Sequence, residues 1–258
     1  MRQIKMLLGV LAFRSGFYRL LFRNKAVIVL FHRVDDRYAS DPISCTRGKF
    51  SLFCAFFSKY FIVVPLSELL RKLKGGEPIG RHLVITFDDG YRDNYEFAAK
   101  ELTRMKLPGC FFIATDFIDS NRVPWWDADA GIVSEWMSWS QVRGLSAQGF
   151  ELGAHTCNHV DLGIVIGAEA EKEIVESGRR LSMEIARPVP FFSYPYGRRH
   201  QITPPNRALV QRAGYACCVS AFGGNVPAGT DPFHLMRTPI SQWHESPYQF
   251  GLEAMLDL

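Results

Sequence analysis

Two neighbouring carboxylates stand at the end of a short apolar run. Residues 84–87 (Val-Ile-Thr-Phe) are β-branched and aromatic, which predicts a buried strand, and Asp88, Asp89 and Gly90 follow directly. Two adjacent acids at a strand end are costly unless a cation lies beside them, and a divalent metal is the simplest such cation. Because Asp-Gly is also a common turn dipeptide, this stretch alone leaves a metal site and an acidic turn both open.

A second pair of candidate ligands is His155 and His159. Histidines four residues apart lie on one side of a helical turn, so both can bind one ion. Two histidines with one carboxylate and an open position form a common catalytic zinc arrangement. The spacing alone would also fit two surface histidines. Combined with the Asp-Asp pair, it predicts a site for a divalent metal.

The candidate polar residues share one position, at or directly after the end of a predicted strand. They are His32, Asp88, Asp89, His155, Tyr196 and Arg237. In an α/β barrel the carboxyl ends of all strands open onto one face, which carries the active site. We therefore expect these side chains to meet on one face of the molecule.

The elements that would position them alternate along the chain. Apolar runs predict strands at 26–31, 62–65, 82–87, 110–114, 150–154, 189–194 and 215–219, with a last extended stretch at 233–240. Helical patterns fall at 50–61, 67–74, 91–106, 138–147, 168–185, 205–213 and 248–256. This alternation predicts a parallel sheet, and the 258-residue length favours one α/β barrel domain over residues 26–258. No dinucleotide fingerprint and no P-loop occurs.

Residues 1–25 form a basic amphipathic segment. Its apolar run, residues 6–13, is too short to span a bilayer, and no small-residue cleavage site of a signal peptide follows it. Wound as one helix, the segment places Arg2, Lys5, Arg19 and Arg23 on one side. It would then either make peripheral contact with a membrane or pack on the outside of the barrel.

The bulk composition restricts the partners and the compartment. The net charge is +4, without a basic stripe interleaved with aromatics, so a nucleic-acid partner is not expected. The six cysteines contain no C-x-x-C pair and read as free thiols, which favours a reducing, cytoplasmic location.

Four segments of the chain resemble motifs of one known family. They are Thr86-Phe-Asp-Asp-Gly90, His155-Thr-x-x-His159, Phe192-Ser-Tyr-Pro-Tyr-Gly197 and Leu30-Phe-His-Arg-Val34. The family is that of the polysaccharide deacetylases (NodB-homology, carbohydrate esterase family 4), and the last segment is similar to an N-terminal Tyr-His-x-Val element of one branch. The resemblance covers about residues 27–240. It implies a distorted (β/α)7-type barrel and metal-dependent hydrolysis of an N-acetyl group on an N-acetylated sugar.

The resemblance also implies roles for individual residues. Asp89, His155 and His159 would hold the metal, usually Zn²⁺, and Asp88 would be the general base. The backbone N–H of Tyr196 would meet the developing oxyanion. The runner-up function is an O-deacetylase or another metal amidohydrolase acting on a non-polysaccharide acylated metabolite.

The chain departs from the common pattern at two places. No late Leu-x-His-Asp-type element is present, so His32 is the expected general acid; the alternative is a buried histidine that closes the barrel mouth. Ser193 stands where the third motif usually has an arginine. Arg237 would then orient Asp88 and keep it ionised, or else form a salt bridge on the barrel rim.

The irregular segment before His155 adds candidates for sugar contacts. An exposed indole of Trp125 or Trp126 could stack on a sugar ring, although aromatic side chains more often belong to the core. Asp127 and Asp129 could bind a sugar hydroxyl or simply be solvated loop acids.

Overall fold

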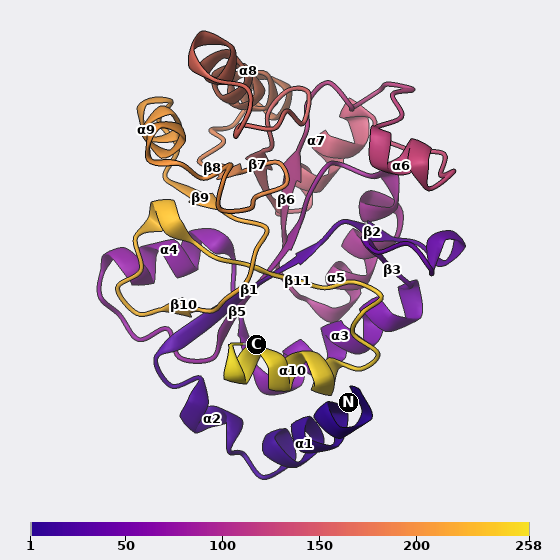
Figure 1. Cartoon of the computed structure of the whole chain (residues 1–258), viewed down its shortest axis with the longest axis vertical. Helices are drawn as coiled ribbons and strands as arrows, with labels where there is room; N and C mark the ends of the chain where they lie inside the picture. Colours follow the sequence, from indigo (N-terminus) through magenta and orange to yellow (C-terminus); the bar gives the residue numbers. More distant parts are fainter. Residues whose placement is uncertain (1, 258) are drawn as a thin grey trace.

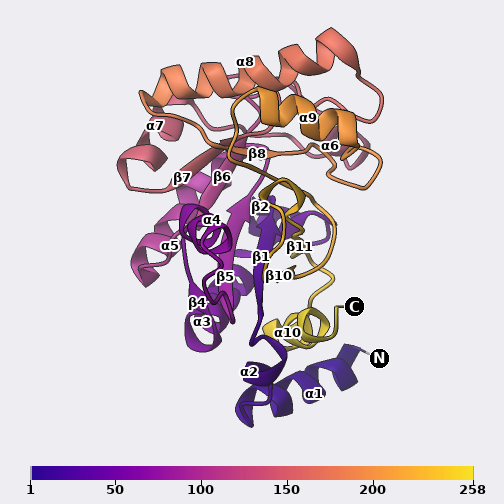
Figure 2. The same cartoon turned by 90° about the vertical axis from the view of Figure 1, so that its left-hand side faces the viewer.

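Alternating apolar strands and helices fold into one curled, mainly parallel sheet with helices outside it (Figures 1 and 2). The computed structural model describes residues 2–257. The strands are β1 (Lys25–Phe31), β2 (Arg33–Val34), β3 (Ser44–Cys45), β4 (Ile62–Val63), β5 (His82–Phe87), β6 (Cys110–Ile113), β7 (Glu151–Ala154), β8 (Phe191–Ser193), β9 (Cys217–Val219), β10 (Val226–Pro227) and β11 (Thr238–Pro239). The helices are α1 (Arg2–Arg14), α2 (Tyr18–Leu21), α3 (Arg47–Tyr60), α4 (Leu66–Lys74), α5 (Ala99–Met105), α6 (Trp125–Asp129), α7 (Trp139–Ala147), α8 (Gly167–Ile185), α9 (Pro204–Arg212) and α10 (Pro247–Leu256).

The sheet has the order β10-β1-β5-β6-β7-β8-β9, and β10 pairs antiparallel at its edge. An irregular segment connects the two ends of the curled sheet. Leu235 forms a parallel bridge with Val219 at the end of β9, and Thr238 in β11 pairs with Val29 of β1. The segment around Arg237 therefore runs between β9 and β1, as in a distorted barrel.

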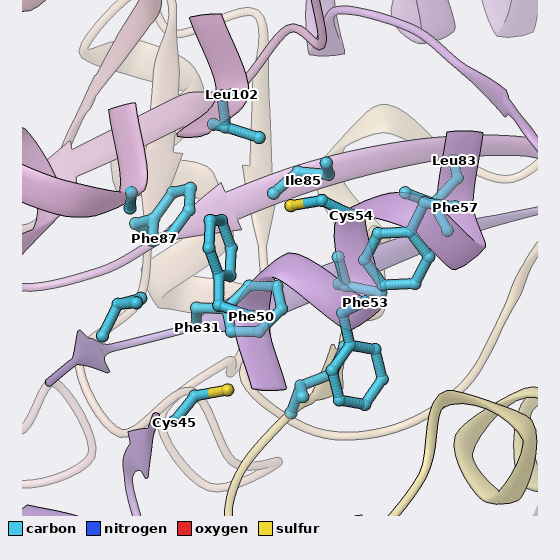
Figure 3. Packing of buried hydrophobic residues seen from close by; sticks show 14 of the residues in the cluster. Phe31, Cys45, Phe50, Phe53, Cys54, Phe57, Leu83, Ile85, Phe87 and Leu102 are labelled. Atoms are coloured by element: carbon cyan, nitrogen blue, oxygen red, sulfur yellow. The ribbon is translucent and has the colours of Figure 1, made fainter. Parts of the chain in front are cut away.

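Three phenylalanines in register hold the strands next to the site. Phe31 of β1 pairs with Phe87 of β5, which pairs with Phe111 of β6. The Phe87 and Phe111 rings stack with centroids 4.6 Å apart. Phe50 of α3 meets both Phe31 and Phe87 edge-on (Figure 3). Aromatic pairs of this kind stabilise by about 1 kcal/mol beyond burial. Because Phe31 precedes His32 and Phe87 precedes Asp88, this packing fixes where both site residues leave the sheet.

On the inner face of the curled sheet, one large aromatic ring packs beside a glycine. Phe112 of β6 is fully buried, and it pairs in register with Gly153 of β7. A Cβ built on Gly153 would lie 2.4 Å from the Phe112 ring, a distance that no real contact allows. A side chain at position 153 would therefore displace the ring, over which the guanidinium of Arg237 lies at 5.4 Å.

The N-terminal segment is two helices rather than the single helix expected. The chain turns at residues 15–17, where Gly16 has a φ of +83°. Helix α1 packs on α10, and a Cβ on Gly9 would lie 2.1 Å from the carbonyl oxygen of Tyr248. Phe13 is buried in the same contact at 2% exposure. Within residues 2–257, no helix is long and apolar enough to cross a membrane.

Most of the predicted elements are confirmed, and the differences are local. Helix α7 forms within the predicted range 138–147 and begins with a capping box of Ser138 and Gln141. The single helix predicted over 91–106 is instead a π-helical stretch (Asn94–Ala98) followed by α5. The extended stretch predicted over 233–240 is a 3₁₀ turn (Pro232–His234) followed by the short β11. The irregular segment before His155 contains the unpredicted α6.

Candidate active site

The two aspartates after β5 reach the same site through a change in backbone conformation. Thr86 and Asp88 share one face of the strand, since both contact Arg237. A regular strand would turn Asp89 to the opposite face. Asp89 instead has a φ of +76°, and Gly90 follows with +98°. This left-handed turn brings the Asp89 side chain to the histidines of the loop after β7.

Asp89, His155 and His159 form a group of buried ligands whose donor atoms all lie within 4.8 Å of one another. The Asp89 Oδ1 atom lies 3.2 Å from His155 Nε2 and 3.3 Å from His159 Nε2. Even so, Oδ1 has no hydrogen-bond partner among the described residues. One carboxylate oxygen and two imidazole nitrogens this close together form a donor set that can bind one metal ion.

The histidine loop does not form the helical turn that the spacing predicts. Residues 155–160 have no helical hydrogen bonds, and Thr156 and His159 have φ values of +60° and +54°. The loop is held from outside by Glu173 of α8, whose carboxylate accepts hydrogen bonds from the backbone N–H groups of Cys157 and Asn158 at 2.8 and 2.9 Å. The two histidines therefore meet through a tertiary contact, and their sequence separation does not by itself place them.

The tautomer of His155 follows from its second nitrogen. Its Nδ1 lies 2.8 Å from the carbonyl oxygen of Ser193, which can only accept a hydrogen bond. Nδ1 therefore carries a proton, and Nε2 is left to face Asp89. Metal-binding histidines are commonly oriented in this way by a backbone carbonyl.

Asp88 is held by Arg237, which the structure places inside the barrel, away from its rim. The Arg237 guanidinium is fully buried and donates to Asp88 Oδ1 at 2.8 Å and Oδ2 at 2.6 Å. It also donates to the Ser193 hydroxyl at 2.8 Å and to Thr86 Oγ1 at 3.0 Å. Ser193 in turn donates to Asp88 Oδ2 at 3.1 Å. The small side chain of Ser193 thus leaves room for a cation that comes from a different part of the chain.

At three of four titratable residues of the site, neighbouring charges outweigh the effect of burial on the pKa. Burial alone would raise the pKa of Asp88, but Arg237 and His155 hold it below its ordinary value. Burial acts in the same way on Asp89, whose contacts with His155 and His159 hold its pKa well below the usual range. Burial would lower the pKa of His155, yet Asp88 and Asp89 raise it. Burial prevails at His32, whose pKa is lowered despite both carboxylates.

His32 and Tyr196 line the same cavity as the metal ligands. The His32 backbone is fixed by Asn94, whose amide donates to the His32 carbonyl oxygen at 2.7 Å. Tyr196 has a φ of +59°, and its hydroxyl accepts a hydrogen bond from Trp125 Nε1 at 3.1 Å. All six predicted strand-end residues therefore reach one cavity or contact a residue that lines it.

The cavity has a second wall formed by Trp125 and Trp126, two of the residues that the sequence offered for sugar contacts. We call these two residues and the buried Asp127 of the same helix the α6 wall. Trp126 lies over the His159 ring with centroids 4.7 Å apart, while Trp125 is 61% exposed at the mouth. The interpretation of Asp127 as a sugar-binding or solvated acid is wrong. Asp127 is 1% exposed, forms an ion pair with the buried Arg33, and accepts a hydrogen bond from Tyr91 at 3.3 Å.

The cavity between the strand ends and the α6 wall has a volume of about 740 Å³. Its lining includes Asp88, Asp89 and the two histidines, several aromatic and apolar side chains, and the polar side chains of Asp161, Arg198, His200 and Gln201. Cavities of a few hundred Å³ with a few converging polar groups are typical of small-ligand sites. This one has room for a sugar unit above the Asp-His-His group.

Comparison with known proteins gives a consistent result. A family model described as polysaccharide deacetylase matches residues 75–218. The chain is similar to the Streptococcus pyogenes deacetylase PplD, solved in complex with acetate, with a TM-score of 0.74 and 19% identity over 90% of this chain and 99% of that one. It is similar to IcaB from Ammonifex degensii, also with a TM-score of 0.74, at 20% identity over 90% and 97% of the two chains. These two likenesses confirm the predicted fold class.

One curated relative also matches in sequence. It is the Bacillus subtilis (strain 168) protein named "Putative polysaccharide deacetylase YxkH", 21% identical over 182 residues. The match takes in 70% of this chain and 60% of the length of that relative.

Proposed function

The chain belongs to the polysaccharide deacetylase family, whose members are hydrolytic carbohydrate deacetylases, and we propose that it removes the N-acetyl group from an N-acetylhexosamine unit of a glycan or glycoconjugate. One observation carries the proposal. Asp89 faces two histidines with an unpartnered oxygen, while its neighbour Asp88 is held apart by Arg237. The two acids are thus equipped for different tasks, one for binding a cation and one for moving a proton.

The donor set fits a divalent metal, and we propose Zn²⁺ held by Asp89, His155 and His159. Two imidazoles and one carboxylate suit zinc better than magnesium, which prefers oxygen ligands. Bound there, the ion supplies Lewis-acid activation of the acetyl carbonyl and of water. The protonated Nδ1 of His155 keeps its Nε2 turned to the ion position.

Asp88 is the proposed general base. Its lowered pKa keeps it ionised at neutral pH, as a proton acceptor must be. Arg237 and Ser193 use three of the roughly four lone-pair positions of the carboxylate, one on Oδ1 and two on Oδ2. A lone pair on Oδ1 is left to take the proton. Arg237 contacts no reacting atom in this scheme, and we propose it as a positioning residue.

We propose His32 as the acid that protonates the leaving amine and the backbone N–H of Tyr196 as a donor to the oxyanion. Because the pKa of His32 is lowered, the ring is mostly neutral at neutral pH and must take up a proton before it can protonate the amine. His32→Ala should therefore slow amide hydrolysis much more than hydrolysis of an activated acetate ester, whose leaving group needs little protonation. Equal losses on both substrates would indicate a structural histidine instead.

The runner-up proposal is an O-deacetylase or another metal amidohydrolase acting on a non-polysaccharide acylated metabolite. It uses the same metal ligands and the same base, and it differs in the demand on the acid. An ester substrate would make little demand on His32, whereas another amide substrate would need it as the acetamide does.

Two measurements test the proposed function. Metal analysis of the purified chain should find about one zinc ion, lost in His155→Ala. Acetate release from N-acetylglucosamine oligomers should fall about 10²–10⁴-fold in Asp88→Asn. The matched control is Asp116→Asn, a surface acid paired with Arg180, which should retain the wild-type rate. A metal-free or magnesium-only protein would refute the zinc site, and full activity of Asp88→Asn would refute the base.

We also propose a cytoplasmic location, with residues 1–25 in peripheral contact with a membrane. The location rests on the six cysteines, which are free thiols in the structure, as a reducing compartment maintains them.

A further inference from the structure

Helix α1 has a fixed inner face. Gly9 and Phe13 lie against α10, and Lys5 forms an ion pair with Glu253 at 2.8 Å. Arg2, at the start of the helix, forms a second ion pair, with Glu245 at 3.1 Å. These contacts determine which side of α1 points away from the rest of the chain.

The outer face of α1 is apolar. Ile4, Leu7, Leu8 and Leu11 are 62%, 60%, 50% and 65% exposed, and their spacing places them in one stripe along the helix. A surface helix of a globular protein ordinarily has a polar outer face. Helix α1 differs, because its outer face is apolar as well as the face that packs on α10. Phe17 and Leu20 extend the exposed apolar surface onto α2 at 52% and 55% exposure. We call these six residues the α1 face. Contiguous exposed apolar surfaces of this kind mark interaction sites.

The charged residues of the N-terminal segment are all of one sign. The first 32 residues contain six arginines and lysines and no acidic residue. Three of the cations, Arg2, Lys5 and Lys25, pair with acids near the C-terminal helix. The other three, Arg14, Arg19 and Arg23, are exposed beside the α1 face, and no carboxylate within residues 2–257 forms an ion pair with them.

We propose that the α1 face docks on an anionic lipid membrane surface, with α1 lying in the plane of the interface. An apolar stripe flanked by cations is the surface that inserts between acyl chains while its charges meet lipid phosphates. A helix of 13 residues is about 20 Å long, too short for a 30 Å hydrocarbon core, so it lies on the membrane and does not span it. A second copy fits less well, because a two-fold interface would bring the same unpaired arginines together.

Docking would also orient the catalytic cavity. Helices α1 and α2 precede β1 and so lie at the amino end of the strands, while the cavity opens at their carboxyl ends. Figures 1 and 2 both place α1 and α2 at the end of the molecule away from α6, α8 and α9. A bound chain therefore turns its cavity away from the lipid on which it sits. The proposal is independent of the hydrolytic one, since no α1-face residue lines the cavity.

The test is vesicle sedimentation of the full chain. Binding to phosphatidylcholine vesicles that contain roughly 30% phosphatidylglycerol should exceed binding to pure phosphatidylcholine vesicles at least about ten-fold. The binding should also weaken as the salt concentration rises. Leu7→Ser/Leu11→Ser should lower binding about ten- to hundred-fold. Arg14→Gln, Arg19→Gln and Arg23→Gln should each lower it about five-fold.

The control variant is Val133→Ser/Met183→Ser, which changes two side chains that are 70% and 69% exposed elsewhere on the surface. It should bind vesicles as the wild type does. Because Leu7 and Leu11 are exposed, Leu7→Ser/Leu11→Ser should retain the wild-type melting temperature and the wild-type rate on a water-soluble acetylated substrate. Absence of wild-type binding, or equal binding by Leu7→Ser/Leu11→Ser, would overturn the proposal. A dimer in light scattering that Leu7→Ser/Leu11→Ser dissociates would overturn it in favour of a second copy.

Discussion

The cavity has two walls that are held in place by different means. On one side, Asp88, Asp89 and His155 follow β5 and β7, which pair with β6 from its two sides, and the sheet register sets their positions. We call these three residues the strand-end wall. On the other side, the α6 wall is a five-residue helix in a long connection, tied down by the buried ion pair of Arg33 and Asp127. The comparison teaches that backbone pairing of the sheet places the strand-end side chains, whereas a small number of side-chain contacts around one buried charged pair places the α6 wall.

The largest effect on stability is expected at the strand ends, where Arg237→Met would leave the Asp88 carboxylate buried without its cation. Removing one partner of a buried pair typically costs about 3–5 kcal/mol in the free energy of unfolding, which urea denaturation measures. The matched control is Arg104→Met, whose exposed pair with Glu101 on α5 should cost less than about 1 kcal/mol. Adding Asp88→Asn to Arg237→Met should recover part of the loss. A cost below that of the control would show that Asp88 is not held by Arg237.

The next effect separates the two walls. Asp127→Ala removes the partner of the buried Arg33, whose next carboxylate, on Asp41, is 3.8 Å away. We expect a loss of about 3 kcal/mol in unfolding free energy and a raised KM, with the zinc content unchanged. Asp129→Ala is the matched control, because Asp129 is exposed on the same helix and should tolerate the change. Loss of zinc in Asp127→Ala would show that the two walls do not act separately.

The strand-end wall could be predicted from sequence because its signals are local. Asp88, Asp89 and His155 each follow an apolar run, and parallel strands bring such ends together. Arg237 could be inferred only indirectly, as a replacement for the arginine that the third motif usually has at the position of Ser193. The ion pair of Arg33 and Asp127 could not be inferred in this way, since 94 residues separate its partners and no periodicity relates them. The signal available was Arg33 itself, a cation directly after a buried strand that needs an acidic partner.

The conformation of the histidine loop could not be predicted from the sequence pattern for another reason. The left-handed φ angles of Thr156 and His159 are unfavourable for these residue types, and Glu173 on the following helix α8 holds the loop through its backbone N–H groups. Local preference alone favours the helical turn, which the tertiary contact overrides.

The attachment of β2, which carries Arg33, should respond to pH through Asp93. Burial raises the pKa of Asp93 to about 7, and its Oδ1 accepts the backbone N–H of Val34 at 2.7 Å. The folded state therefore holds a proton that the unfolded chain releases near pH 4, so this contribution to stability declines as the pH rises from about 4 to 7 and is constant above. Relative to Asp93→Asn, the wild type should lose about 2 kcal/mol between pH 5 and 7 in urea unfolding. A difference that does not vary with pH would contradict the raised pKa.

The smallest effect is expected where the two walls meet. The exposed Trp125 donates from Nε1 to the Tyr196 hydroxyl at 3.1 Å, and its indole face is open to the cavity mouth. If a sugar ring stacks on it, Trp125→Ala should raise KM about five-fold, for a contact of about 1 kcal/mol, and leave kcat and the unfolding free energy unchanged. Trp243→Ala, which removes an indole that is 54% exposed outside the cavity, should leave both kinetic constants unchanged. A fall in kcat with KM unchanged would mean that Trp125 acts through the Tyr196 turn instead of by holding substrate, and the α6 wall would then serve the strand-end wall.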